Sequence, residues 1–424
     1  MKYEDVNIDD LLADVEKLLG DEPKKAESPK VSAPLEHKEE KEERKEVKKV
    51  NTTPKSGKKK SGKPKKKVSK VRKFFIGLGK TLLVLLETVL LLVIALYGVM
   101  YVLAKGPSPT ARDLFVMSVR ETSAMKWVAN IYFTDEEIAL IESGGEEDSV
   151  EEYVETDTSL INITKPTEAP DSDVPQGPVA DEWGFVDEDG DGIIVDPVTG
   201  EGFVGYMMIV KDPSRVIMGT VPYSYNGRGY TVAEMVEKFD AVAGINAGGF
   251  EDLNGTGNGS TPSTMTVFEG KVYYEGKGVQ DGFVGFDSNH VMHVGKFTAK
   301  DIQEKDIQYG VAFGPVLVIN GEAADRSKLA SGINPRTAIG QRSDGAVLML
   351  VVDGRQAISL GCTWIDMVDI FLEYGAVNAC NLDGGSSTLM WYQGDYINNC
   401  ASVVGIRPVP TTFLVMKEGA MDNG

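Results

Sequence analysis

The alternation of hydrophobic and polar positions divides the chain into stretches of different character. Near the start, "IDDLLADVEKLLG" places apolar residues at helical spacing, which predicts a short amphipathic helix over residues 8–20. Residues 21–77 are dense in Lys, Glu, Pro and Ser, and such a segment buries too little apolar surface to offset its conformational entropy. We therefore expect residues 1–77 to form a disordered tail. Its helix is either transient or a docking peptide for a partner protein.

Residues 78–104 are almost continuously apolar, with Glu87 among them. About 20 apolar residues suffice to cross the hydrocarbon core of a bilayer. A cleaved signal peptide would stand at the very N-terminus and have a shorter apolar core. The long polar tail ahead of this segment therefore favours a retained transmembrane helix.

The pattern changes twice more after the apolar segment. Helical periodicity over residues 105–134 predicts a neck, and the Asp, Glu, Pro, Ser and Thr of residues 135–182 are typical of an extended, self-repelling linker. Over residues 183–417, β-rich runs such as "FVGYMMIV" and "AVLMLVVDG" are separated by glycine-rich turns. This stretch is long enough for a single folded domain.

Two helices are marked inside that domain by capping boxes. Thr231 with Glu234 precedes "AEMVEKF", and Thr363 with Asp366 precedes "MVDIFLEY", which Gly375 then ends. Each helix leads directly into an apolar strand. The order of elements predicts an α+β fold, with a mixed β-sheet flanked by helices.

Charge follows the same division of the chain. Of the 44 basic and 64 acidic side chains, residues 1–106 carry 24 and 16, so the remainder carries 20 and 48. The acidic balance of the outer part argues against nucleic acid as its ligand. Residues 51–80 hold many lysines and no acid, which predicts that the N-terminus is cytoplasmic and that the C-terminal domain lies outside the cell membrane. Anionic membrane lipid is the nearest partner for this basic cluster, and residues 8–20 would meet a cytoplasmic partner.

Two aspartates end strands that flank the second predicted helix. "AVLMLVVDG" ends in Asp353 and "AVNACNLDGG" ends in Asp383. If the two strands run parallel, both carboxylates emerge at the same edge of the sheet, at a separation suited to glycosidic chemistry. The alternative is that each aspartate closes a D-G turn. That alternative is weaker for Asp383, because a plain turn does not need the "GGSST" that follows.

Glycine-rich turns supply the remaining candidates for binding. Glycines let backbone amides approach a ligand, and the hydroxyls of "GGSST" suit an anionic group such as phosphate. The P-loop is excluded, since no G-K-[ST] follows. Another such turn, "INAGGF", begins with Asn246, whose amide suits sugar hydroxyls, and in "NPRTAIGQRSDG" the planar fork of Arg336 is a natural grip on phosphate. On its own, Arg336 would equally suit a surface ion pair.

At this point the motifs "INAGGF", "AFGPVLVINGE", "NPRTAIGQRSDG" and "NLDGGSSTLMW", in this order, resemble the phosphodiester glycosidase domain family. The resemblance covers roughly residues 200–417. It implies catalytic roles for Asp383, Asp353 and Arg336, and substrate binding by Asn246, Gly248, Gly249, Gly384, Gly385, Ser386 and Ser387. Many relatives have two aromatic residues after the first motif, whereas this chain has Phe250 followed by Glu251.

The implied activity is hydrolysis of a sugar-1-phosphodiester in a cell-envelope or exopolysaccharide substrate by a membrane-anchored glycosidase. Such a leaving group needs little protonation, so Arg336 and the glycine loop would stabilise the departing phosphate while Asp383 acts as nucleophile or general base. Asp353 would orient or assist, and no cofactor is required. Two alternatives stay open: a non-catalytic module that binds phosphorylated polysaccharide, and a phosphodiesterase that cleaves the phosphorus–oxygen bond.

A candidate metal loop precedes the first strand of the domain. In "VDEDGDGIIVDP", Asp187, Asp189, Asp191 and Gly192 match four positions of a calcium loop, but Val198 stands where the bidentate glutamate belongs. The segment is either a structural calcium site or an acidic turn.

Cysteine usage leaves the redox state open. Cys362, Cys380 and Cys400 lie close together in the sequence of the outer domain. One disulfide could form among them, but the odd count and the apolar neighbours favour buried thiols.

Overall fold

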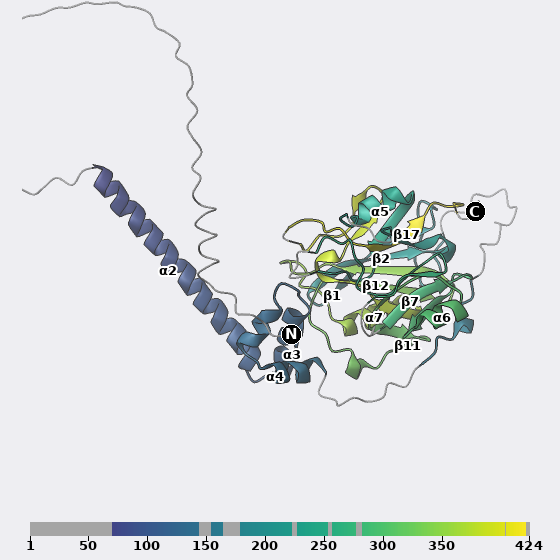
Figure 1. Ribbon diagram of the computed structural model, residues 1–424, viewed down its shortest axis with the longest axis horizontal. Helices are drawn as coiled ribbons and strands as arrows, with labels where there is room; N and C mark the ends of the chain where they lie inside the picture. The colour runs from purple at the N-terminus through teal and green to yellow at the C-terminus, as the bar shows by residue number, and fades with distance from the viewer. Residues whose placement is uncertain are drawn as a thin grey trace, which may run out of the picture. The chain divides into compact units, whose positions relative to one another are not determined.

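The computed structural model describes residues 70–143, 154–163, 179–222, 227–252, 257–276, 282–402 and 404–420 (Figure 1). The helix expected over residues 8–20, and the expected tail as far as residue 69, lie outside the described residues.

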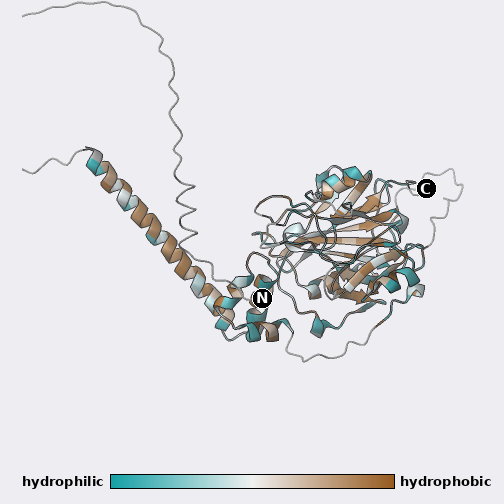
Figure 2. Cartoon of the chain, viewed as in Figure 1, coloured by the Kyte–Doolittle hydropathy of each residue, from teal (hydrophilic) through white to brown (hydrophobic). Residues whose placement is uncertain are grey.

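A single long helix, α2 (Lys70–Lys105), contains the apolar segment. Within the described residues it is the helix whose length and composition suffice to cross a membrane. Its apolar side chains are exposed on all sides, and Figure 2 shows it hydrophobic along most of its length. A helix that is apolar all round needs an apolar surrounding, which a bilayer supplies.

The neck is a small helical cluster that follows α2. Its elements are α3 (Pro109–Arg120), η1 (Lys126–Ile131) and α4 (Asp135–Glu142). Ala104, from the last turn of α2, is buried among Val116, Ala129 and Phe133 of this cluster. These helices therefore form a folded unit built onto the end of α2.

The acidic linker expected over residues 135–182 differs in the structure. A capping box of Thr134 and Glu137 starts α4 inside it. The short helix η2 (Thr158–Leu160) follows, and the Thr156 hydroxyl donates a hydrogen bond of 3.0 Å to the Val294 carbonyl. Local capping and contacts with the domain thus order parts of a segment whose composition alone indicates a tether.

Three sheets form the domain, and the strand pairs among the described residues are antiparallel. A seven-stranded sheet has the order β1-β2-β13-β12-β14-β10-β11, and two five-stranded sheets have the orders β16-β15-β4-β17-β3 and β6-β5-β9-β7-β8. The bounds are β1 Ile193–Gly200, β2 Phe203–Val210, β3 Val216–Thr220, β4 Ala241–Asn246, β5 Thr266–Phe268, β6 Lys271–Tyr274, β7 Gly282–Asp287, β8 Met292–Gly295, β9 Ile307–Phe313, β10 Val316–Ile319, β11 Glu322–Ala323, β12 Arg336–Arg342, β13 Val347–Val352, β14 Ala376–Asn381, β15 Met390–Tyr392, β16 Asp395–Tyr396 and β17 Thr411–Met416.

The main core lies between the sheets. It combines buried side chains from all three, such as Met349 of the seven-stranded sheet with Phe413 and Phe286 of the other two. Helices cover the outer faces: α7 (Trp364–Glu373) packs Phe371 against the first sheet, α5 (Val232–Lys238) covers β3 and β17, and α6 (Ala299–Glu304) covers the third sheet. The 3₁₀ helices η3 (Pro213–Arg215), η5 (Arg326–Lys328) and η6 (Gly385–Ser387) lie in connecting loops. The predicted α+β class is confirmed.

The capping boxes of Thr231 and Thr363 are both present where the sequence predicts them. The strands that precede Asp353 and Asp383 also run in the same direction, as expected, although they are not adjacent in the sheet. Strands β13 and β14 each pair with β12 in antiparallel register, so they run parallel to one another as next-nearest neighbours. They consequently end at the same edge of the sheet.

Candidate active site

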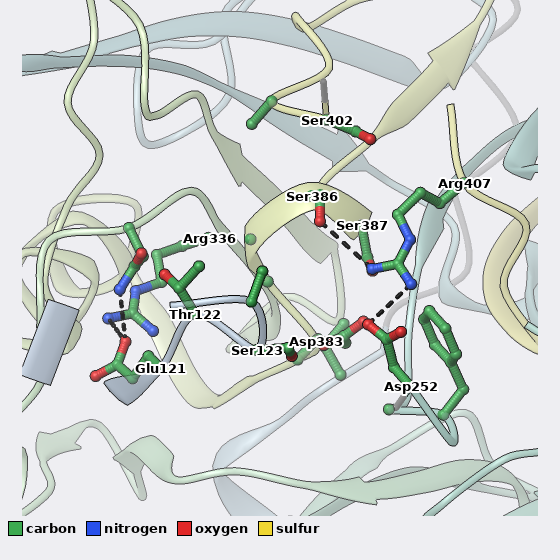
Figure 3. A pocket seen from close by; sticks show the side chains of 18 of the residues that line it. Glu121, Thr122, Ser123, Asp252, Arg336, Asp383, Ser386, Ser387, Ser402 and Arg407 are labelled. Carbon is green, nitrogen blue, oxygen red and sulfur yellow. Dashed lines mark hydrogen bonds and ion pairs between the residues drawn. The ribbon is translucent and has the colours of Figure 1, made fainter. Parts of the chain in front are cut away.

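A pocket of about 760 Å³ opens where β14 ends. Its walls come from the loops after β4 and β14, from residues 401–407, and from residues 121–125 of the neck (Figure 3). Seven of the predicted site residues line it: Arg336, Gly249, Asp383, Gly384, Gly385, Ser386 and Ser387.

Asp383 lies on the pocket wall, held from behind by the first glycine-rich turn. Its amide donates to the Ala247 carbonyl at 2.9 Å, and the buried Asn246 side chain donates to its carbonyl. Burial raises the pKa of Asp383 to about 7, the nearby Asp252 carboxylate acts in the same direction, and hydrogen bonding to Ser387 and the charge of Arg407 oppose both. A carboxyl group that titrates near neutrality is suited to proton transfer.

Arg407 and Asp252 form an ion pair beside Asp383. The Arg407 Nη2 atom lies 2.8 Å from Asp252 Oδ2, and the guanidinium stacks 4.9 Å from the centre of the Phe250 ring. Arg407 Nη1 also donates to the Ser386 hydroxyl at 3.4 Å. Figure 3 shows this pair beside Ser386 of the glycine loop, residues 384–387, so the Arg407 guanidinium borders the loop while it is paired with Asp252.

The glycine loop packs closely against the strand that carries Arg336. The Gly385 amide donates to the Pro335 carbonyl at 2.8 Å, and a β-carbon at Gly384 would lie 2.7 Å from that same oxygen. Gly385 has φ +63°, a conformation that side chains disfavour. The glycines therefore permit the close fit of the loop, and Ser386 and Ser387 line the pocket.

Arg336 lines the pocket, but its guanidinium is already engaged. Nη2 lies 2.7 Å from the Glu121 carboxylate and donates to the Gly332 carbonyl at 2.6 Å, while Nε donates to the Cys362 carbonyl at 3.2 Å. The phosphate grip expected of Arg336 is thus directed instead at a carboxylate from the neck.

Arg355 provides another cation at the pocket. Its Nη2 atom donates to the Thr122 hydroxyl at 2.8 Å and to Asn334 Oδ1 at 2.9 Å. A β-carbon at Gly385 would lie 3.4 Å from the same Nη2, so the guanidinium is beside the glycine loop. Burial, and then the charge of Arg336, lowers the pKa of Arg355. The loop is consequently flanked by Arg355 and Arg407.

Three predicted residues do not line the pocket. Asn246 is fully buried, and its Oδ1 accepts from Thr337 Oγ1 at 2.8 Å and from the Leu389 amide at 3.1 Å, so it supports Asp383 from behind. A β-carbon at Gly248 would lie 2.4 Å from Val311 Cγ2, which makes that glycine a packing position.

Asp353 is the third of these residues. It is 1% exposed, and its carboxylate accepts from the Asn398 side chain at 3.0 Å and from the Asn399 amide and side chain at 2.9 and 3.0 Å. The strand ends where expected, but the carboxylate turns into the protein. There it fixes the loop that leads to the pocket wall at residues 401–407.

Sequence reasoning missed Asp252, Arg355, Arg407 and the neck residues Glu121 and Thr122. The signals were faint: Asp252 opens a glycine-rich loop, Arg355 follows the D-G of "VVDG", and Arg407 precedes a proline as Arg336 follows one. None of these patterns indicates which carboxylate pairs with Arg336 or with Arg407.

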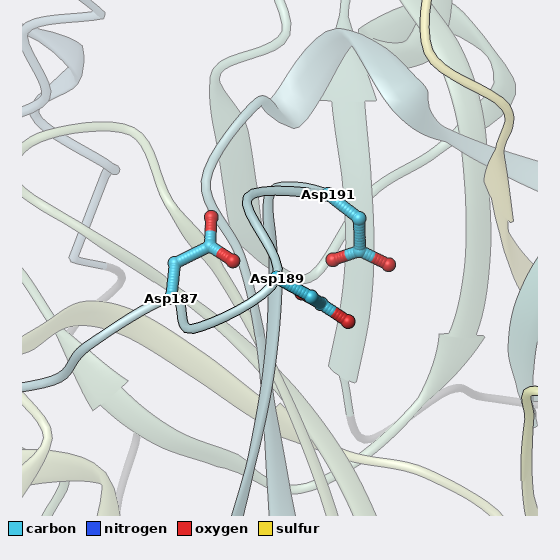
Figure 4. A group of neighbouring side chains, drawn as sticks. All are labelled: Asp187, Asp189 and Asp191. Atoms are coloured by element: carbon cyan, nitrogen blue, oxygen red, sulfur yellow. The ribbon is translucent and has the colours of Figure 1, made fainter. Parts of the chain in front are cut away.

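The candidate calcium residues lie away from this pocket, in the turn before β1 (Figure 4). Carboxylate oxygens of Asp187, Asp189 and Asp191 come within 4.8 Å of one another. However, Asp187 accepts from the amides of Gly190 and Gly192 and pairs with Lys211 at 3.1 Å, and Asp191 accepts from Tyr392. The turn is therefore held by protein donors, and calcium binding stays a prediction.

Cys362 and Cys380 are buried free thiols, and Cys400 is a partly buried one. Burial raises the pKa of Cys380 to about 12. A buried thiol that stays protonated is a weak nucleophile, so Cys380 serves packing.

Part of the domain matches a known protein family. A family model described as phosphodiester glycosidase matches residues 239–416. Residues 239–416 form a phosphodiester glycosidase domain. This family consists of hydrolases acting on glycosyl phosphodiester bonds. Every pocket residue from Gly249 to Arg407 lies within the domain, whereas residues 121–125 are outside it.

Three similar proteins share 16 to 34% of their aligned residues with this chain. The SPbeta prophage-derived uncharacterized protein YomE of Bacillus subtilis (strain 168) is 34% identical over 222 residues, which cover 50% of this chain and 33% of that protein. This chain thus spans about a third of the length of that curated relative. Two solved structures are similar at lower identity. One is the zebrafish N-acetylglucosamine-1-phosphodiester alpha-N-acetylglucosaminidase catalytic domain, auto-inhibited by its pro-peptide (20% identity, TM-score 0.44, 53% of this chain and 82% of that one). The other is a putative exported protein of Burkholderia pseudomallei (16%, 0.39, 50% and 74%).

Proposed function

We propose that this protein is a membrane-anchored glycosidase that hydrolyses a sugar-1-phosphodiester of a cell-envelope polymer or exopolysaccharide on the outer side of the membrane. The observation that carries the proposal is the pairing, in one pocket, of Asp383, whose pKa lies near 7, with the two arginines that flank the glycine loop. The match of residues 239–416 to phosphodiester glycosidases supports the same chemistry.

The phosphate group would bind between Arg407 and Arg355, over the Ser386 hydroxyl. Arg407 now faces the Asp252 carboxylate, and an incoming phosphate would share that guanidinium. A planar guanidinium offers several donors to the oxygens of a phosphate, and its charge offsets the negative charge that grows on the leaving group.

Asp383 would act on the anomeric carbon or on the attacking water. In its ionised form it accepts the proton of water as the water oxygen bonds to C1, and the C1–oxygen bond breaks with its electron pair passing to the phosphate. Because that leaving group is a weak base, phosphate binding contributes more than protonation. The alternative in which Asp383 attacks C1 directly uses the same placement.

Asp353 and Asn246 would act through other residues. Asp353 fixes the loop ahead of the 401–407 wall, and Asn246 holds the Asp383 backbone. Arg336 would hold the neck against the pocket through Glu121. These assignments move three predicted residues from direct contact with the substrate to support of those that make it.

Hydrolysis in heavy-oxygen water tests the proposal with an ethyl sugar-1-phosphodiester as substrate. We expect the label in the anomeric hydroxyl of the released sugar. Label in the phosphate product would mean phosphorus–oxygen cleavage, that is, a phosphodiesterase. Saturable binding of the diester with no turnover would mean a non-catalytic polysaccharide-binding module.

A further inference from the structure

Four exposed large hydrophobic side chains of the domain lie on two loops that contribute residues to the pocket. Among the described residues beyond Val186 they are Ile358, Leu360, Val404 and Ile406, with exposed fractions of 70, 59, 80 and 42%. Single exposed apolar side chains are ordinary on any protein, but a group of them at one place marks a contact surface. We call these four the apolar rim.

Both loops that carry the apolar rim border the pocket. Val404 lines the pocket itself, and Ile406 precedes the pocket residue Arg407. On the other side, the amide of Arg355 donates to the Leu360 carbonyl at 3.1 Å. The Gln356 side chain donates to the Asn399 carbonyl at 3.3 Å, which ties the two loops together.

The neck adds apolar surface to the same mouth. Met125 lines the pocket and is 44% exposed, and Trp127, two residues further on, is 65% exposed. The neck in turn is built onto the last turn of α2, where Lys105 lies 4.1 Å from the ring centre of Phe133 and 3.6 Å from Glu137. The pocket mouth is therefore close along the chain to a helix with the character of a membrane span.

A phosphodiester bound in this pocket has two organic substituents that point in different directions. The sugar must lie toward Asp383 for its anomeric carbon to react. The second substituent then leaves the phosphate toward the mouth of the pocket, which the loops of the apolar rim border. An apolar chain along this rim would remove hydrophobic surface from water on both partners.

We propose that the substrate is a lipid-linked sugar phosphodiester, whose hydrocarbon tail leaves the pocket over the apolar rim and continues into the membrane. This inference rests on the proposed function of the pocket. The tail is an isoprenoid or alkyl chain rather than a second saccharide, because the rim offers apolar side chains where a saccharide would need hydrogen-bonding groups.

Two substrates and two variants of the full chain in lipid nanodiscs test this inference. The substrates carry the same sugar-1-phosphate, esterified either to ethanol or to a long isoprenoid alcohol. The rim variant combines Ile358→Ser with Leu360→Ser, and the control is Leu140→Ser, which changes a comparably exposed leucine on α4. We expect the rim variant to lose about ten-fold in kcat/KM for the isoprenoid substrate, since two aliphatic contacts are removed, and to keep its rate on the ethyl substrate.

A lipid substrate is concentrated in the bilayer, and this raises the rate equally for every variant because all of them keep helix α2. Comparing the variants therefore cancels this effect. An equal effect of the rim variant on both substrates, or no effect on either, would overturn the inference and leave the glycosidase intact. Loss of a wild-type dimer in the rim variant, without a substrate-dependent change, would overturn it in favour of a contact between copies. If neither substrate releases its sugar, the proposed function itself fails.

Discussion

In the proposed mechanism, the chemistry of the pocket depends on Asp383. Its position after β14 and its "GGSS" neighbours single it out in the sequence, but the feature that makes it useful, a pKa near 7, comes from its burial. Burial is a property of the folded surroundings, so the sequence could point to the carboxyl group and not to its titration.

We predict that Asp383→Asn lowers kcat by about 10²–10⁴-fold, the usual contribution of a positioned acid or base. In the wild type, kcat/KM should rise with pH through about 7, because the ionised carboxylate is the reactive form. A pH profile that is flat between 5.5 and 8 would contradict this role. Asp395→Asn, which makes the same change in an exposed carboxyl of β16, should leave the rate unchanged.

The same substitution should change stability with a definite sign. Between the ordinary value of 3.8 and about 7, the unfolded chain has lost the Asp383 proton and the folded chain keeps it, so the free energy of unfolding falls as pH rises through this window. Asp383→Asn should therefore raise the melting temperature more at pH 8 than at pH 5. We expect a gain of about 1–2 kcal/mol at pH 8, below the full equivalent of the shift because the pocket admits water.

The roles of the individual arginines could not be predicted from the sequence. The sequence points to Arg336 through "NPRTA", and the structure places it at the pocket but pairs it with Glu121. Arg355 and Arg407 carry no comparable signal. Whether a guanidinium faces a ligand or a carboxylate depends on contacts between segments far apart in the chain, here 215 residues in the case of Arg336.

At the scale of elements, the neck was the least expected part of the site. Its helices follow from local periodicity, and in the structure the side chains of Ser108 and Thr134 cap two of them. Its contact with the domain does not: the Glu121 carboxylate accepts from the Gly332 amide at 2.8 Å and from the Asn334 side chain at 2.9 Å. Such a contact relies on pairing across the chain rather than on any local pattern.

We predict that Glu121→Gln separates residues 121–125 of the neck from the rest of the pocket. The change keeps the size of the side chain but leaves Arg336 without its counter-charge, so we expect a loss of about 1–3 kcal/mol in the free energy of unfolding and a higher KM. Amide hydrogen exchange at Gly332 should accelerate.

Glu142→Gln is the matched control within the neck. Glu142 pairs with Arg120 at 2.8 Å on the surface, so its loss should cost less than about 0.5 kcal/mol and leave KM unchanged. Equal effects of the two substitutions would mean that Glu121 contributes to the neck alone.

Part of the strand arrangement could be predicted from the sequence. The runs ending in Asp353 and Asp383 were expected to reach one edge, and they do. The expected mixed sheet is replaced by antiparallel pairing in three sheets, since β12 inserts between β13 and β14. Hydrophobic alternation specifies strands and their inward faces, while the choice of neighbour depends on the whole core.

At the scale of the whole molecule, the proposed membrane anchoring rests on α2 and on the basic segment ahead of it. We predict that the full chain stays with membranes during alkaline carbonate extraction. Protease added outside intact cells should remove a C-terminal tag and spare an N-terminal one. Replacing the seven lysines of residues 58–67 by serine should invert part of the population, because the basic flank sets the orientation. An N-terminal tag that is cleaved in the unaltered chain would contradict the topology.

The docking of Glu121 would also limit where the proposed reaction occurs. An enzyme carried on a long free tether samples a range of heights above a lipid surface and can work on polymer far from it. Here residues 121–125 of the neck form one wall of the pocket, so separating the neck from the domain would dismantle the cavity. If α2 spans the membrane as proposed, the 12 residues of α3 would set the height of the pocket above the bilayer, and the enzyme would reach only substrates at that height.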